Sequence, residues 1–472
     1  MEVLKENFRD ILPVFQEALD RAEIVGLDLE FTGIKGRPEY YNDTLQERYE
    51  KNRRVAMTYK IIQVGVSLME KKNNKWEARP FNFYVFPEEI GSNNPRVILE
   101  AGAIAFLRMH DMDFNKWIYQ GIPYMNSQQD QEMFNKLYTR EKEEESELSI
   151  SKPYDVAKIE SAIKTIEEFL TSEQKQTELA GLNAFLRKYM YSHIKKNYPQ
   201  LFVETLREQK GKVVTILLKK VGESELAALE EQKTKEKEKH YYEKLGFRRV
   251  FTMLAESKKT IVCHNGIYDL MFMLASFHGE LPESYCKFKE IVRTLFPNIV
   301  DTRYLLEKVP GLWDEFNHAS AARGLGEFYS FLLPKYQDLV FLSAGFERYK
   351  DENYAHEAAY DAFMCATCLV ILQENFSVEP YLNFLPVYRS FFCINLSGED
   401  LLDSEEHVHF KGEEVRSFFA GKEGFNAKFI KEDEAFVQAT SPEHSEELRS
   451  LMQGGKFTVM SLEDYFKSKN TS

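Results

Sequence analysis

The amino-acid sequence predicts a mixed α/β protein made of several folded units. The chain has 472 residues, 43% of them hydrophobic, so two or three units with cores of their own are expected. Strand-like runs and amphipathic helical patterns both recur along it. Between residues 139 and 152 the stretch TREKEEESELSISK is charged, contains serine and has the composition of a linker.

The first third of the chain is predicted to hold a helix followed by three strands. The apolar spacing in ENFRDILPVFQEALDRA indicates an amphipathic helix over residues 6–22. Strand-like runs follow at residues 24–33 (IVGLDLEFTG), 59–68 (YKIIQVGVSL) and 81–87 (FNFYVFP).

Beyond the linker, residues 153–240 are predicted to form a separate small α+β unit. Two helical patterns come first, at residues 154–170 and 181–196, and two strand-like runs follow, at 201–208 and 212–221. A lysine- and glutamate-rich stretch, residues 225–245, then has the pattern of a long solvated helix.

Sheet-like signals resume in the second half of the chain. They occur in TIVCHNGIYDLMFML (residues 260–274) and NIVDTRYLL (residues 298–306), and HEAAYDAFMCATCLVIL (residues 356–372) predicts a helix with one apolar face. After Asn395 the patterns follow the order βαββαβ, which is typical of a small α+β domain.

Composition also limits the class of protein. The N-terminus lacks the basic and apolar regions of a signal peptide, and no run of about eighteen apolar residues predicts a membrane span. Five scattered cysteines form no disulfide framework, so we expect an intracellular protein of the cytoplasm or nucleus. The net charge of −14 argues against indiscriminate nucleic-acid binding and is compatible with a metal site lined by carboxylates.

Four acids and one histidine stand at suggestive positions. Asp28 and Glu30 lie two residues apart on a predicted strand, so their side chains share one face. Asp269 begins a helix that follows a strand, and Asp361 lies on a later helix, five residues after His356. Taken alone, the first pair also fits a solvated strand edge.

Together these five residues suit phosphodiester hydrolysis by two metal ions. Two Mg²⁺ ions held roughly 3.5–4 Å apart need several anionic oxygen ligands, which Asp and Glu supply. A histidine with a pKa near about 6.5 suits the base that takes a proton from the attacking water.

The motifs DLEFTG, CHNGIYDLMFML and HEAAYDAF resemble those of the DEDD exonuclease superfamily, in its histidine subclass. The chain is most similar to the poly(A)-specific ribonuclease branch, which includes the trimmer of pre-piRNA 3′ ends, and the similarity spans most of its length. The resemblance implies an RNase H-like core that binds two Mg²⁺ ions, with Mn²⁺ as a possible substitute. It makes His356 the general base and the four acids the metal ligands, Asp28, Glu30, Asp269 and Asp361. A Glu at position 357 excludes the tyrosine subclass.

The resemblance also implies a domain organisation. A nuclease domain over residues 1–145 and 245–392 would be interrupted by a single-stranded-nucleic-acid-binding domain over residues 153–240. That domain is named for an arginine and a histidine with three residues between them, whereas Arg187 and His193 here have five between them. RNA contact, or packing and dimerisation alone, therefore both stay open for this unit.

The segment 395–472 resembles an RNA-recognition fold, in which aromatic side chains on the central strands stack on bases. Phe436 is present, but a second aromatic is missing from its strand, which favours a structural or interface role. In the resembled deadenylase, a tryptophan of the C-terminal domain stacks on the methylated guanine cap of the RNA. This segment has no tryptophan. Phe436 or Tyr465 would bind the cap base more weakly.

Substrate contacts are less defined by the sequence. The resemblance puts Phe31 and Ile34 beside the terminal adenines, and both also suit a core. Arg303 suits either a phosphate contact or an ordinary surface position. Asp301 suits a structural hydrogen bond better than a fifth metal ligand.

The resulting hypothesis is a 3′-to-5′ exoribonuclease that shortens adenylate-rich single-stranded tails and releases nucleoside 5′-monophosphates. Its expected partners are single-stranded RNA with a free 3′ end and a second copy of the chain in a homodimer. A trimmer of small-RNA 3′ ends and an RNA-binding scaffold without catalysis are the alternatives. The pair Cys365 and Cys368 is expected to be buried rather than to bind zinc.

Overall fold

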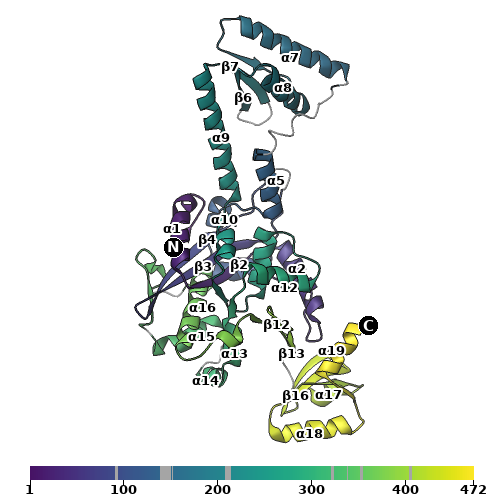
Figure 1. Ribbon diagram of the computed structural model, residues 1–472. Helices are drawn as coiled ribbons and strands as arrows, with labels where there is room; N and C mark the ends of the chain where they lie inside the picture. The colour runs from purple at the N-terminus through teal and green to yellow at the C-terminus, as the bar shows by residue number, and fades with distance from the viewer. Residues whose placement is uncertain are drawn as a thin grey trace. The chain divides into compact units, whose positions relative to one another are not determined.

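The computed structural model describes residues 1–90, 94–138, 150, 152–207, 214–319, 324–336, 338–350, 354–402 and 407–471. They form two compact units, Met1–Ser127 with Leu245–Ser472, and Gln128–Lys244 (Figure 1). Most of the predicted linker, residues 139–152, lies outside the described residues. Among the described helices, none has the length and apolar composition needed to cross a bilayer.

A seven-stranded mixed sheet forms the centre of the first unit. Its order is β1-β4-β3-β2-β8-β9, and β10 pairs with β4. Strand β2 runs antiparallel to β3 and parallel to β8. The strands are β1 (Glu2–Val3), β2 (Ile24–Phe31), β3 (Ile61–Lys72), β4 (Lys75–Tyr84), β8 (Thr260–Cys263), β9 (Ile299–Asp301) and β10 (Val340–Leu342). The predicted mixed α/β class is confirmed.

Two strand predictions need correction. Strand β4 begins at Lys75, six residues before the predicted start, because Asn73 and Asn74 take positive φ angles of 49° and 63° and make a tight hairpin with β3. In NIVDTRYLL only Ile299–Asp301 is a strand, because the Asp301 carboxylate accepts a hydrogen bond from the backbone N–H of Arg303 and caps a helix there.

Helices cover both faces of this sheet. The predicted N-terminal helix is α1 (Phe8–Arg21), and the helices that follow in the first unit are α2 (Leu45–Thr58), α3 (Ala101–Met109), α4 (Phe114–Gln120), α10 (Arg248–Ser257), α11 (Ile267–Met273), α12 (Tyr285–Leu295), α13 (Thr302–Lys308), α14 (Leu312–Ala319), α15 (Leu325–Leu332) and α16 (Ala358–Gln373). Residues Val25, Leu27 and Leu29 of β2 pack with α1, α10 and α11, whereas Ile24 packs on the other face with α16.

Helix α16 differs from its prediction. The sequence indicated one apolar face, but every residue from Ala358 to Leu372 is buried. The helix lies between the sheet on one side and α15 on the other (Figure 1). A helix enclosed in this way is apolar all round, so the prediction of a solvent-facing side was wrong.

Two glycines let α16 lie directly on the sheet. A Cβ atom on Gly26 of β2 would stand 2.1 Å from the carbonyl oxygen of Ala362, and one on Gly65 of β3 would stand 2.0 Å from that of Ala358. Both distances are far below contact distance, so only glycine fits at these positions.

The second unit has its own core. Strands β5 (Gln176–Leu179), β6 (Leu201–Arg207) and β7 (Val214–Lys220) form an antiparallel sheet in the order β5-β7-β6, of which β5 was not predicted. Side chains from this sheet pack with α7 (Pro153–Thr171) and α8 (Ala184–Asn197). Helices α5 (Ser127–Tyr138) and α9 (Glu223–Leu245) complete the unit.

The C-terminal part of the first unit contains two further sheets. Strands β11 (Phe384–Pro386), β12 (Phe392–Asn395) and β13 (Leu401–Leu402) form the smaller one. The larger has the order β15-β16-β14-β17. Along the chain its elements are β14 (Val408–Lys411), α17 (Val415–Phe419), β15 (Phe425–Lys431), β16 (Glu434–Ala439), α18 (Pro442–Gln453) and β17 (Thr458–Ser461), followed by α19 (Leu462–Thr471).

The close approach of α16 gives a first prediction. Replacing Gly65 with Ala forces the α16 backbone away from β3, so we expect the free energy of unfolding to fall by about 3 kcal/mol or more. Gly326→Ala is the matched control, because a Cβ at that helical position meets no atom within 4 Å. The control should be neutral or stabilising by up to about 1 kcal/mol. Urea titrations measure both, and equal stability of the two variants would contradict the close-contact explanation.

Candidate metal and catalytic site

The first two acids lie on the face of β2 that packs against α16. Their strand neighbours Val25, Leu27 and Leu29 belong to the apolar core on the opposite face, so alternation directs Asp28 and Glu30 toward α16. Strand pairing puts Asp28 opposite the glycine at position 65, and the register shifts between Glu30 and Phe31, the last residue of the strand.

Asp269 reaches the same region from a different segment. It is the third residue of α11, only 7% exposed, and α11 follows the parallel strand β8 through a tight turn. The carboxylate of Asp301 fixes that turn by accepting hydrogen bonds from the backbone N–H groups of Asn265 (3.1 Å) and Gly266 (2.9 Å). Asp301 therefore has the structural role expected of it.

Asp361 and His356 are joined through the backbone. Both Asp361 carboxylate oxygens accept from the backbone N–H of His356, at 3.2 and 3.3 Å. The backbone of His356 has a φ of 69°. This value lies in the left-handed region, which residues other than glycine adopt infrequently. Its imidazole Nδ1 lies 4.0 Å from an Asp361 oxygen, and its side chain is 40% exposed.

The start of α16 is held on both sides of this turn. The Gln63 side-chain oxygen of β3 accepts the backbone N–H of Ala358 at 3.2 Å. The Glu357 carboxylate accepts hydrogen bonds from the Tyr349 hydroxyl and from the Arg348 guanidinium, the latter at 2.5 Å. The sequence did not predict these contacts of Gln63 and Glu357, because only the tertiary structure brings their partners together.

Burial raises the pKa of all four carboxylates, and repulsion by the other site acids adds to the shift for Asp28 and Glu30. Burial raises the pKa of Asp28 well above its ordinary range, and the charges of Asp361, Asp269 and Glu30 raise it further. Burial, followed by Asp361 and Asp269, does the same to the pKa of Glu30. Burial also raises the pKa of Asp269 and of Asp361 to about 7, although a backbone hydrogen bond opposes each shift. Four repelling acids at one place are the electrostatic environment that a divalent cation relieves.

The donor set fits a hard divalent cation. Oxygen and imidazole ligand atoms of Glu30, His356 and Asp361 all lie within 4.8 Å of one another. Carboxylate oxygens are the ligands that Mg²⁺ and Mn²⁺ prefer. Burial, and then the neighbouring His110, lower the pKa of His356, which keeps its imidazole neutral and able to accept a proton at neutral pH.

The three predicted substrate contacts lie in different environments. The half-buried Phe31 ring packs on Phe272, with ring centroids 4.0 Å apart. Ile34 is 53% exposed just beyond the strand that carries the acids. The Arg303 guanidinium donates to Glu307 at 2.6 Å and lies 5.1 Å from the Trp313 ring, so its charge is already paired within the protein.

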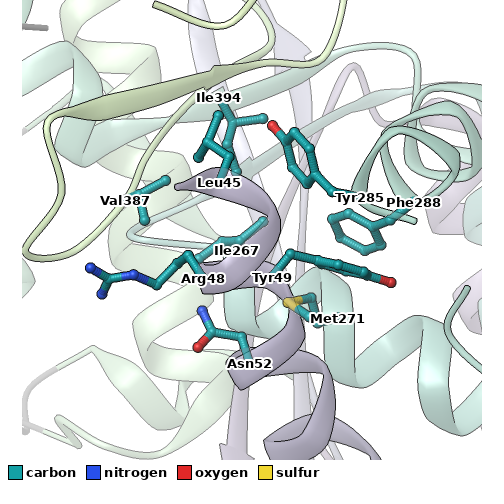
Figure 2. Close-up of a pocket in the computed structure, with 10 residues that line it drawn as sticks. All are labelled: Leu45, Arg48, Tyr49, Asn52, Ile267, Met271, Tyr285, Phe288, Val387 and Ile394. Atoms are coloured by element: carbon teal, nitrogen blue, oxygen red, sulfur yellow. The ribbon is translucent and has the colours of Figure 1, made fainter. Parts of the chain in front are cut away.

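A small cavity has residues of both α2 and α11 in its lining (Figure 2). Its volume is about 10 Å³, which is room for one water molecule. It is lined by Leu45, Arg48, Tyr49, Asn52, Ile267, Met271, Tyr285, Phe288, Val387 and Ile394. None of the predicted site residues lines it, and its size excludes a nucleotide.

The buried Arg48 beside this cavity braces the loop that follows the site. It pairs with Glu39 at 2.7 Å and donates to the carbonyl oxygens of Tyr40 (2.6 Å) and Arg389 (2.9 Å). The hydroxyl of Tyr268, the residue before Asp269, donates to the same glutamate and to Asn52. These contacts connect the base of α11 to the C-terminal part of the unit.

The cysteine pair of α16 and the aromatic residue Phe436 of β16 are both buried. Cys365 and Cys368 are fully buried in α16, as expected, and burial raises the pKa of both thiols. Phe436 is fully buried, so its suggested role as a substitute cap-stacking residue was wrong.

Comparisons with known proteins identify a family and several similar proteins. The family described as CAF1 family ribonuclease matches residues 3–369. The Poly(A)-specific ribonuclease PARN of Xenopus laevis is 27% identical over 100% of this chain and 82% of its own. The Pre-piRNA 3′-exonuclease trimmer of Bombyx mori is 28% identical over 79% and 71% of the two chains. The S. pombe Pop2p structure in its Mg²⁺ and Mn²⁺ bound form matches with a TM-score of 0.40 and 14% identity, over 82% of this chain and 98% of that one.

The chain is thus a nuclease, and it belongs to the CAF1 ribonuclease family. The resemblance inferred from the motifs is confirmed at the level of this family.

The raised carboxylate pKa values give a second prediction. Asp361 titrates near pH 7 in the folded metal-free protein and near 3.8 when unfolded, so the folded state binds more protons and loses stability as pH rises between those values. Asp361→Asn removes this penalty. The free energy of unfolding of the Asp361→Asn variant, relative to that of wild type, should therefore increase by about 2–3 kcal/mol from pH 5 to pH 8.

Chemical denaturation in EDTA measures this difference. Asp314→Asn, which removes an exposed acid of α14, is the control and should show no such trend. Added Mg²⁺ should reverse the order, because it stabilises only the protein that keeps its ligands. A variant no more stable than wild type at pH 8 in EDTA would show that burial does not raise the pKa of Asp361 as described.

Proposed function

We propose that this protein is a metal-dependent 3′-to-5′ exoribonuclease that removes adenylates from single-stranded RNA tails. The observation that carries the proposal is the convergence of four repelling carboxylates from β2, α11 and α16 beside a half-exposed histidine. The strand order, with antiparallel β2 and β3 followed by parallel β8 and β9, supports an RNase H-like core.

Asp28, Glu30, Asp269 and Asp361 would hold two Mg²⁺ ions, with Mn²⁺ as a substitute. When bound, the ions would acidify the attacking water and stabilise the leaving 3′ oxygen. Because its pKa is lowered, the imidazole of His356 is neutral at neutral pH, and it accepts the proton of that water. Cleavage of the terminal phosphodiester then releases a nucleoside 5′-monophosphate.

Apolar side chains beside these acids offer a contact surface for the terminal bases. Phe31 and Ile34 continue the strand that carries Asp28 and Glu30, and Ile34 is exposed. These two residues are the proposed base contacts, whereas Arg303 would reach a phosphate only after giving up Glu307.

Two accessory domains and a homodimer belong to the same proposal. The compact unit Gln128–Lys244 supports an inserted α+β domain, and the βαββαβ order of the C-terminal sheet supports an RNA-recognition-like domain. The five free cysteines favour an intracellular location, in the cytoplasm or nucleus.

Trimming of small-RNA 3′ ends is the second candidate. The similarity to the Bombyx mori protein, whose name describes a pre-piRNA 3′-exonuclease trimmer, favours it. The two candidates differ in how strongly the site selects adenine.

One experiment tests the function and separates the candidates. The protein is incubated with Mg²⁺ and 5′-labelled RNAs that carry A, C, G or U tails of equal length. We expect stepwise shortening, fastest on the A tail. Asp28→Ala and Asp269→Ala should abolish it, and His356→Ala should slow it by about 10²–10⁴-fold while RNA binding persists. Asp314→Ala is the matched control and should match wild type.

The outcomes are distinct. Equal rates on all four tails would replace the deadenylase by the trimmer. RNA binding without shortening would indicate the scaffold alternative, and full activity of either ligand variant would remove that residue from the metal site.

A further prediction concerns the 5′ end of the RNA. All three tryptophans, Trp76, Trp117 and Trp313, precede residue 395, and Phe436 is enclosed by the protein. A cationic cap base stacks best on tryptophan. We therefore expect capped and uncapped oligoadenylated RNAs to be shortened at nearly equal rates, and free cap analogue to inhibit weakly. A several-fold advantage of the capped RNA in a time course would reveal another aromatic in this role.

A further inference from the structure

Two aromatic side chains from the region of α3 pack against the imidazole of His356. The His110 ring centroid lies 4.2 Å and the Phe106 centroid 4.6 Å from that of His356. His110 and Phe106 also contact each other, with centroids 4.6 Å apart, so the three rings form one cluster. Neither α3 residue belongs to the motifs from which the site was inferred.

The His356 ring needs such an external support. Its backbone is held in a left-handed turn by Asp361, and the adjoining Glu357 is tied to Arg348. These contacts fix the main chain but leave rotation about the side-chain bonds open. The ring itself packs on the two α3 aromatics and stays 4.0 Å from the nearest Asp361 oxygen.

Helix α3 is in turn fixed to the strand that carries the acids. The backbone N–H of Glu100, the residue before α3, donates to the carbonyl oxygen of Thr32 at 2.8 Å. Its carboxylate accepts the backbone N–H groups of Ile34 (2.9 Å) and Lys35 (2.8 Å). Leu107 anchors the other end of the helix in a buried apolar cluster. The ring cluster therefore has a defined position relative to Asp28 and Glu30.

We propose that His110 is a positioning residue, whose ring packs on His356 and holds that imidazole in the orientation from which it takes the proton. The inference rests on the proposed function of His356 as the base. His110 acts here through ring contact, a role that another aromatic side chain fulfils equally.

The test compares three variants of the full chain in the deadenylation assay. His110→Ala should lower kcat about tenfold and leave KM unchanged, because the imidazole of His356 loses the ring that orients it while substrate binding is untouched. His110→Phe keeps the ring and should restore most of the rate. Met109→Ala, which truncates the adjacent exposed side chain, is the matched control and should retain wild-type kinetics.

A double-mutant cycle isolates the contact. In a His356→Ala background, adding His110→Ala should cause no further loss of kcat. An undiminished tenfold loss in that background, or a Phe variant as slow as the Ala variant, would overturn the ring-packing role. So would a His110→Ala enzyme as fast as the Met109→Ala control.

A spectroscopic measurement stands apart from activity. The His356 ring signal, identified in ¹³C-histidine-labelled protein by its loss in His356→Ala, should shift in His110→Ala and stay fixed in Met109→Ala. An unmoved signal overturns the inference. A shifted signal in a protein that hydrolyses no RNA would overturn the proposed function while leaving the ring contact established.

Discussion

The structure depends on the direct contact between the backbone of α16 and two glycines of the central sheet. Because Gly26 and Gly65 have no side chains, the helix lies close enough for Asp361 to share a site with Asp28. A larger residue at either position would occupy the space of the helix backbone. The rest of α16 is buried on all sides, so close packing keeps the helix from shifting relative to the sheet.

That packing creates an electrostatic cost at the same place. Burial raises the pKa values of the four carboxylates, and their mutual repulsion adds to it for Asp28 and Glu30. The surrounding apolar core offsets this cost by holding the acids together before any cation binds. A site assembled in advance loses little conformational freedom on binding, and this is an advantage for ions that need several ligands at once.

How much the sequence predicted depends on how local each feature is. Alternation along β2 was sufficient to put Asp28 and Glu30 on one face, and the mixed α/β class followed from local patterns. The complete burial of α16 was missed because it depends on α15 and the sheet together. The early end of β9 depends on the Asp301 cap, and the contact of His110 with His356 joins distant segments without any shared motif. Tertiary contacts of this kind leave no periodic trace in a sequence.

The C-terminal sheet does not offer its central aromatic side chain to a base. Phe436, the aromatic that an RNA-recognition fold would offer to a base, packs instead against Phe391, Tyr465 and Phe466. Its face is therefore filled by α19 and by the segment before β12. A base could stack there only by displacing several buried aromatic side chains, each of which stabilises the fold by about 1.5–3 kcal/mol. In the proposed function adenine therefore contacts Phe31 and Ile34, beside the acids that would hold the metal ions, and not Phe436.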